Sequence, residues 1–108
     1  MANSFKNYFL KNANTTSQNV YVAGAGVSAT VIGMTIGNTT AAPISANITV
    51  TSGGTSYFML QGATIATGGA LVPIGGDQKL VLETGDFVQV QTSAANSADV
   101  IVSVLEIT

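Results

Sequence analysis

Short runs in which apolar and polar residues alternate follow one another along the whole chain. In residues 87–91, Val88 and Val90 point to one side, and the two Gln side chains point to the other. This period of two is the signature of a strand with one buried face. Residues 80–82 form another apolar run, and the Gly and Asp in residues 83–86 favour a tight turn between the runs. The stretch is therefore predicted to be strand, turn, strand.

The same pattern recurs at intervals of about ten residues, which is typical of an all-β chain. Clusters of Gly, Pro, Asn or Ser separate the runs, and no helix of two turns is expected. The predicted strands are residues 19–23, 27–38, 44–51, 56–61, 70–74, 80–82, 87–91 and 99–107. About eight strands in a chain of 108 residues predict an all-β fold, a single-domain antiparallel β-sandwich that is jelly-roll-like.

Two of these strands have faces that the alternation assigns in detail. In residues 19–23, Val20 and Val22 are predicted to face the core, with Tyr21 on the other side. In residues 27–38, three large apolar side chains share one face, and the glycines of the other face suggest a bend or a bulge. The first set is Ile32, Met34 and Ile36, and the second is Val31, Gly33, Thr35 and Gly37.

The last predicted strand is apolar on both of its faces. Val100, Val102 and Val104 lie on one face, and Ile101 and Leu105 lie on the other. A strand with two apolar faces is usually buried on both. In a sandwich of two sheets, a partner subunit would bury the second apolar face of this strand.

Aromatic residues cluster only near the amino terminus. Residues 1–12 are predicted to be an N-terminal arm or edge strand, and residues 13–108 the β-sandwich domain. Three interpretations of the aromatic side chains stay open, with core packing favoured over an arm docked on a neighbour and over a ligand-stacking patch. As a strand, this stretch places Phe5, Asn7 and Phe9 on one face and Lys6, Tyr8 and Leu10 on the other.

Charge depletion is the most informative feature of the composition. Charged residues make up 7% of the chain, against roughly 25% in a typical soluble domain. Interface centres are depleted of charge, so an assembly is favoured over a lone monomer. Three lysines, no arginine and a net charge of −2 argue against nucleic acid as a partner. No run approaches the roughly 20 apolar residues that span a bilayer, and no secretory signal is expected.

Candidate chemistry is sparse. The chain has neither cysteine nor histidine, so disulfides, thiolate sites and the commonest general base are excluded. Asp77, Glu83, Asp86 and Asp99 would bind calcium only if their loops converged, and turn capping is favoured for Asp77 and Asp86. No catalytic site, cofactor or metal is predicted, and an enzyme is not expected.

Several segments resemble small structural proteins of tailed-bacteriophage virions. They are MANSFKNYFLKNANTT at the start, ATVIGMTIGNTT in the middle, GGDQKLVLETGDFVQVQTS and the final SADVIVSVLEIT. The resemblance covers nearly the whole chain, although residues 22–25 read Val-Ala-Gly-Ala where related proteins often have Val-Pro-Ala-Gly. It implies a non-enzymatic component of the virus particle. Such proteins decorate capsids, often as trimers at three-fold positions, or belong to the neck and tail.

The first hypothesis is a capsid decoration, or cement, protein that binds and stabilises the shell of the phage major capsid protein. It would be a homo-oligomer, with a trimer favoured, made in the host bacterial cytoplasm and located on the virion. Deleting residues 1–12 is expected to weaken shell binding and to leave the sandwich folded. Contact residues are expected to be Phe5, Lys6, Tyr8, Phe9, Leu10, Ile101 and Leu105. The alternatives are a neck, tail or baseplate component and, more remotely, a carbohydrate-binding module.

Overall fold

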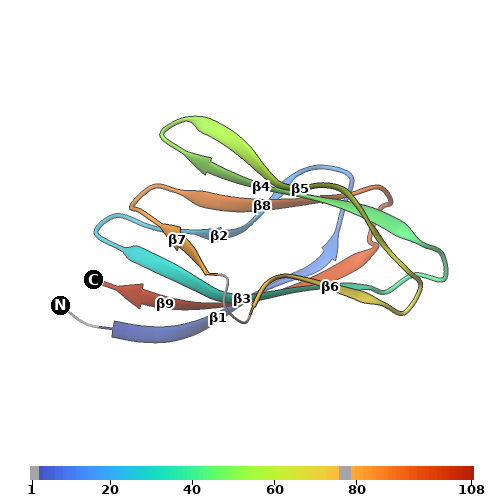
Figure 1. Cartoon of the computed structure of the whole chain (residues 1–108), viewed down its shortest axis with the longest axis horizontal. Helices are drawn as coiled ribbons and strands as arrows, with labels where there is room; N and C mark the ends of the chain where they lie inside the picture. Colours follow the sequence, from blue (N-terminus) through green and yellow to red (C-terminus); the bar gives the residue numbers. More distant parts are fainter. Residues whose placement is uncertain (1–2, 76–78) are drawn as a thin grey trace.

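The described part of the chain is built from strands. The computed structural model describes residues 3–75 and 79–108, and the strands and loops are drawn in Figure 1. The strands are β1 (Asn3–Ala13), β2 (Gln18–Val22), β3 (Ser28–Asn38), β4 (Ile44–Ser52), β5 (Thr55–Ile65), β6 (Ala70–Ile74), β7 (Leu80–Leu82), β8 (Phe87–Thr92) and β9 (Ala98–Ile107).

The strands form two antiparallel sheets that pack face to face (Figure 1). Sheet A has the order β1-β9-β3-β6, with β7 also paired to β3, and sheet B has the order β2-β8-β4-β5. This interleaved order is that of a jelly roll, in which two Greek keys share a sandwich. The predicted fold class is therefore confirmed. Each of the eight predicted strands has a counterpart, and the ninth strand is β1, in the segment predicted to be an arm or edge strand.

The core lies between the sheets and is almost entirely aliphatic. The alternation predicted for β8 and β9 is confirmed, since Val88, Val90, Val100, Val102 and Val104 are all at most 2% exposed. Fully burying one such side chain stabilises the fold by about 1.5–3 kcal/mol. The two sheets are thus held together chiefly by the side chains that the period-two pattern identifies.

The faces predicted for β2 are wrong beyond its first valine. The pairing of β2 with β8 shifts between Asn19 and Tyr21, so Val20 is an extra residue in the ladder. Such a bulge turns the following side chains to the opposite face. Tyr21 is consequently only 3% exposed, whereas Val22 is 47% exposed.

A second bulge changes the faces of β3. The register against β9 shifts between Val31 and Gly33, and Ile32 is the extra residue. Val31 therefore joins Met34 and Ile36 in the core, while Ile32 is only partly buried. The bulge lies directly before Gly33, one of the glycines that suggested it. Because of the bulge, Ile32 does not lie on the predicted face with Met34 and Ile36.

The predicted turn between β7 and β8 is present, but the two strands do not pair with each other. The Asp86 N–H donates to the Glu83 carbonyl at 2.9 Å, and Gly85 has a φ of 91°. The Asp86 carboxylate accepts the Glu83 N–H at 3.0 Å, which confirms turn capping at this residue. β7 belongs to sheet A and β8 to sheet B, so the turn crosses between the sheets. Asp77 lies outside the described residues.

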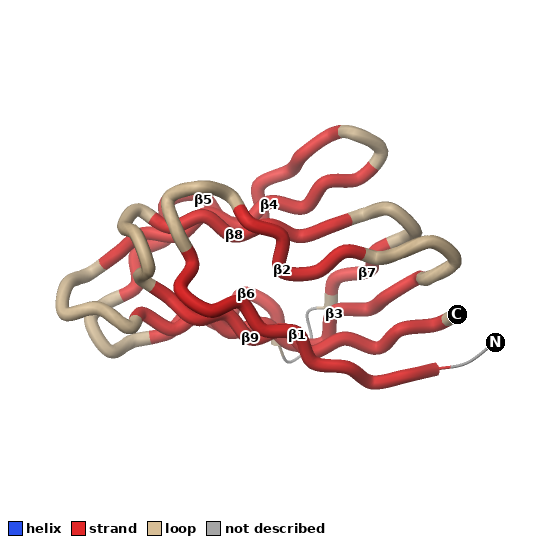
Figure 2. Tube along the Cα trace, turned by 180° about the vertical axis from the view of Figure 1, so that it is seen from behind, coloured by secondary structure: helices blue, strands red, loops and turns tan. Residues whose placement is uncertain are grey.

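β1 is an edge strand of sheet A and pairs with β9 from Asn3↔Ile107 to Leu10↔Val100 without a register shift. The first twelve residues therefore include most of a strand of the sandwich. In Figure 2, the tip of the β4–β5 hairpin stands apart from the rest of the molecule. Tyr57 and Phe58 lie on this hairpin and are 58% and 57% exposed.

The position of β1 changes the outcome expected for a truncation. Removing residues 1–12 strips one strand from sheet A and opens the edge of β9. We now expect the melting temperature of the truncated chain to fall by more than about 10 °C, or the cooperative transition to be lost. Thermal unfolding followed by circular dichroism checks this. A truncated chain that melts like the full chain would show that β1 contributes little to the fold.

Candidate functional site

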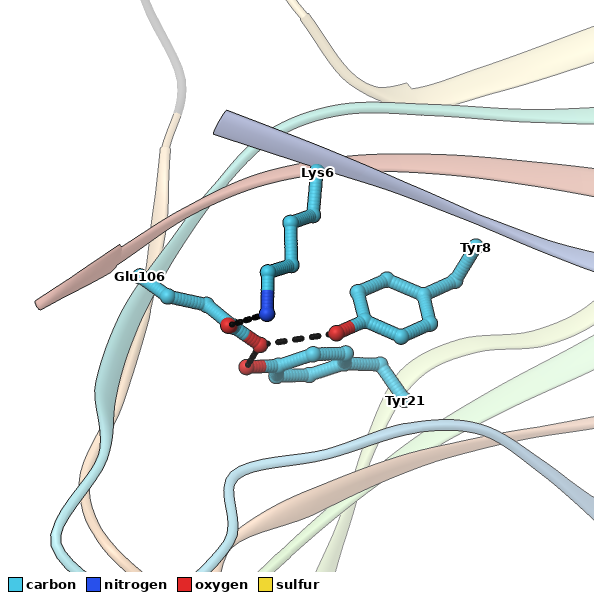
Figure 3. A network of polar contacts seen from close by, with 4 residues as sticks. All are labelled: Lys6, Tyr8, Tyr21 and Glu106. Carbon is cyan, nitrogen blue, oxygen red and sulfur yellow. Dashed lines mark hydrogen bonds and ion pairs between the residues drawn. The ribbon is translucent and has the colours of Figure 1, made fainter. Parts of the chain in front are cut away.

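A polar network of four residues lies between the two sheets (Figure 3). Glu106 of β9 lies at its centre and is only 7% exposed. One carboxylate oxygen accepts hydrogen bonds from the hydroxyls of Tyr21 at 2.7 Å and Tyr8 at 2.8 Å. The other oxygen forms an ion pair with the Lys6 ammonium at 3.0 Å. Tyr21 belongs to sheet B and the other three residues to sheet A, so the network joins the sheets.

The network satisfies a carboxylate that would otherwise be costly to bury. The hydrogen bond from Tyr21 is the largest influence on Glu106 and, together with Lys6, holds its pKa below the usual value. Removal from water is the largest influence on Tyr21 and Tyr8, and it raises the pKa of both phenols. The two rings meet edge to face, with their centroids 4.8 Å apart. Glu106 is therefore a charged structural group, and both of its carboxylate oxygens have partners.

The outer face of sheet A is the surface on which most of the predicted contact residues meet. Its central part is formed by three rows of directly opposed residues that cross the strands, and directly opposed side chains share a face. The rows are Phe5–Leu105–Thr30–Val81, then Asn7–Ser103–Gly33, then Phe9–Ile101–Thr35. Two apolar rows therefore flank a polar one, in which the Ser103 hydroxyl donates to the Asn7 side chain at 3.1 Å.

The three rows carry no charged residue and expose large apolar side chains. Phe5, Phe9, Val81 and Ile101 are 76%, 70%, 66% and 46% exposed. Two shallow depressions of about 250 and 210 Å³ lie beside β1 and β9, next to Phe5 and Phe9 respectively. Both are smaller than the pockets that usually enclose a small molecule, which measure about 300–1,000 Å³. This geometry suits a broad protein contact better than a ligand pocket.

The structure divides the predicted contact residues between two faces. Phe5, Phe9, Ile101 and Leu105 lie together in the apolar rows of the outer face. The other three point inward, because Tyr8 and Leu10 pack against the core and Lys6 reaches Glu106. The interpretation as core residues is therefore wrong for Phe5 and Phe9, whose side chains the alternation of β1 directs to the outside.

Sequence reasoning missed the role of Glu106. Its position continues the series Val100, Val102 and Val104, which marks it as the one charged side chain on the buried face of β9. A carboxylate at such a position needs partners from elsewhere in the fold. This signal was available in the sequence, but Tyr21, the partner of Glu106, was predicted to lie on the wrong face of β2.

The remaining carboxylates of the described residues do not converge. Asp99 accepts hydrogen bonds from Lys11 at 3.0 Å and from the Asn12 backbone at 3.1 Å, and the Asn12 bond is the main reason why its pKa is lowered. Among residues 3–75 and 79–108, no three acidic side chains form a metal-binding group. The described residues also contain no helix that is long and apolar enough to cross a membrane.

Comparison with known proteins supports the fold. No protein-family model matches the chain, and no curated protein matches it. One similar solved structure comes from Bacillus endospore appendages, described as a novel family of disulfide-linked pili. Identity is 18%, the match covers 98% of this chain and 88% of the other, and the TM-score is 0.59. Similarity at this level shows a shared fold with a structural protein.

The comparison does not extend to the mode of assembly. The described pili are linked by disulfides, whereas this chain contains no cysteine. Any assembly of this chain must therefore use non-covalent contacts or another chemistry. The resemblance to tailed-phage virion proteins stays a prediction.

Replacing Glu106 with glutamine tests the network. The variant keeps an oxygen acceptor but loses the ion pair with Lys6, so we expect the free energy of unfolding to fall by about 1–3 kcal/mol. Urea unfolding at neutral pH measures the change. The control is Glu83→Gln at an exposed turn, which should leave stability within about 0.5 kcal/mol of the wild type. Equal effects of the two substitutions would contradict a structural role for Glu106.

The network also predicts a loss of stability in acid. Folding lowers the pKa of Glu106, so its contribution is complete above the unfolded value of about 4.3 and is lost as the pH falls through the lower folded value. Unfolding curves below pH 5 should therefore converge for the wild type and Glu106→Gln. Asp99 has a lowered pKa in both proteins, so it contributes equally to their remaining acid sensitivity. A constant gap between the two proteins down to pH 2 would refute the assignment.

Proposed function

We propose that this chain is a decoration, or cement, protein of a tailed-bacteriophage capsid. It binds the shell of the major capsid protein through the outer face of sheet A and stabilises it without catalysis. The observation that supports this proposal is the face itself, on which Phe5, Phe9, Val81 and Ile101 are exposed and the three rows carry no charge. The sequence resemblance to virion proteins supplies the identity of the partner.

The proposed mechanism is burial of apolar surface over a broad area. Each square ångström of apolar surface removed from water contributes about 25 cal/mol, although association costs offset much of this gain. The polar row of Asn7 and Ser103 divides the apolar rows and offers hydrogen bonds to a partner backbone. A decoration protein repeats such a contact many times over a shell, so modest single contacts suffice when copies are linked.

A pilus-like fibre subunit is the second candidate. The observation that favours it is the fold shared with the endospore-appendage chain. A fibre of this chain would have to be held by strand or face contacts, because no cysteine is present. The two candidates differ in what the purified protein does alone. A fibre subunit polymerises, whereas a decoration protein stays in small oligomers until shells are added.

A single substitution on the outer face tests the first candidate. Ile101 lies on β9, one strand in from the edge, so Ile101→Asp places a carboxylate within the proposed contact. Burying that unpaired charge against the shell should raise the dissociation constant at least about tenfold. Binding to undecorated shells of the encoding phage, followed by co-sedimentation, measures this.

The matched control is Phe58→Asp on the other sheet. Phe58 lies opposite Thr49, which lies opposite Gln89, so its side chain shares the outer surface of sheet B. It is 57% exposed, which is close to the exposure of Ile101. We expect wild-type binding for this variant. If both variants bind shells as the wild type does, the outer face of sheet A is not the contact.

A further inference from the structure

Among the described strands, three of the four sheet edges are short or irregular. β2 has five residues and a register shift, and the opposite edge of sheet A is divided between β6, which contains Pro73, and the three-residue β7. β5 is long, but its pairing with β4 shifts twice, on either side of Ile48. Short strands, proline and bulges are the devices by which proteins prevent strands from adding at an edge.

β1 is the regular edge. Residues 3–10 pair with β9 over eight consecutive positions without a shift, and the register shifts only between Leu10 and Ala13, at the end of the strand. An inward-pointing charge can protect an edge strand against the addition of another strand. On β1, however, the Lys6 ammonium is paired with Glu106 between the two sheets. Phe5 and Phe9 stand exposed on the outer face of the same strand. This edge therefore offers unpaired backbone groups next to uncovered aromatic rings.

The side chains of β1 are self-complementary about Asn7. Phe5 and Phe9 are equally distant from it, so an antiparallel second copy centred on Asn7 places each Phe5 opposite Phe9 of the partner subunit. Aromatic pairs across antiparallel strands stabilise a sheet. On the inner face, the same register places Lys6 opposite Tyr8 of the partner subunit, so the two Lys6 side chains do not face each other. Lys11 lies beyond the regular stretch and forms an ion pair with Asp99 of its own chain.

We propose that two copies of this chain join through their β1 edges in this antiparallel register. Sheet A of one copy then continues into sheet A of the other, and the two outer faces form one double-sized surface. A contact of one edge with itself requires a two-fold axis, whereas the expected trimer requires two different edges to meet. The pairing is independent of the proposed function, because it concerns the free protein and no shell.

Charge at position 7 tests the register. Asn7 is exposed and lies opposite itself in the proposed dimer, so Asn7→Lys and Asn7→Asp each place two like charges face to face. Light scattering coupled to size exclusion should give a dimer mass for the wild type and a monomer mass for each variant. An equimolar mixture of the two variants should recover the dimer mass, because opposite charges then face each other. Circular dichroism verifies that both variants are folded.

Cross-linking gives a second, independent measurement. The chain has no cysteine, so Asn7→Cys introduces a single thiol. Directly opposed residues have Cβ atoms about 4.5–5.5 Å apart, which is within reach of a disulfide after a small adjustment. Mild oxidation should therefore convert Asn7→Cys to a covalent dimer and leave the control Ser56→Cys, on the β5 edge, uncross-linked.

Three outcomes of these measurements would overturn the inference. A wild-type mass of one or three copies excludes the two-fold pair, as does a dimer that Asn7→Lys leaves intact. Cross-linking of Ser56→Cys in place of Asn7→Cys would assign the pairing to β5. Failure of shell binding by the wild type, with these masses as expected, would overturn the proposed function and leave the edge pairing standing.

Discussion

The burial of one carboxylate between the two sheets is the constraint on which the rest of the structure depends. Glu106 is 7% exposed, and its oxygens are satisfied only when β1, β9 and β2 are all in place. An unpaired carboxylate at this depth would cost more than most single contacts in the core contribute. The network therefore couples the edge strand of sheet A to the nearest strand of sheet B, and it links local pairing to closure of the sandwich.

A second polar group has a comparable role at another point between the sheets. The Asn38 side-chain amide, at the end of β3, donates to the carbonyls of Ala42 at 2.9 Å and Ile65 at 3.1 Å. These bonds tie sheet A to the end of β5 in sheet B. The aliphatic core between these two groups is non-directional, since apolar burial depends on area and not on orientation. Glu106 and Asn38 supply the directional contacts that fix how the sheets meet.

The same arrangement leaves a broad uncharged surface and a regular edge outside. Because Lys6 turns inward to Glu106, β1 presents Phe5, Asn7 and Phe9 to solvent, and the charges beside them are those of the ion pair between Lys11 and Asp99. Most of the few charged groups have structural partners within the chain, including Asp99 with Lys11 and Asp86 at its turn. The polar contacts within the chain thus leave few free charges on the surface, and this, together with the exposed apolar groups, supports the proposed assembly.

The sequence by itself determined the fold class, most strand positions and the alternation along β8 and β9, because period-two burial is a local property of each strand. It also placed Phe5 and Phe9 on one face of β1. Only the tertiary structure decided that Tyr21 lies in the core, that Val31 replaces Ile32 there, and that β7 and β8 belong to different sheets. The first two depend on bulges, because an extra residue shifts the register and reverses the faces on one side of it relative to the other. The third depends on a turn that crosses between the sheets. Glu106 was visible as a charge in an apolar series, but its partners come from strands about 85 to 100 positions away in the chain, which no local pattern can bring together.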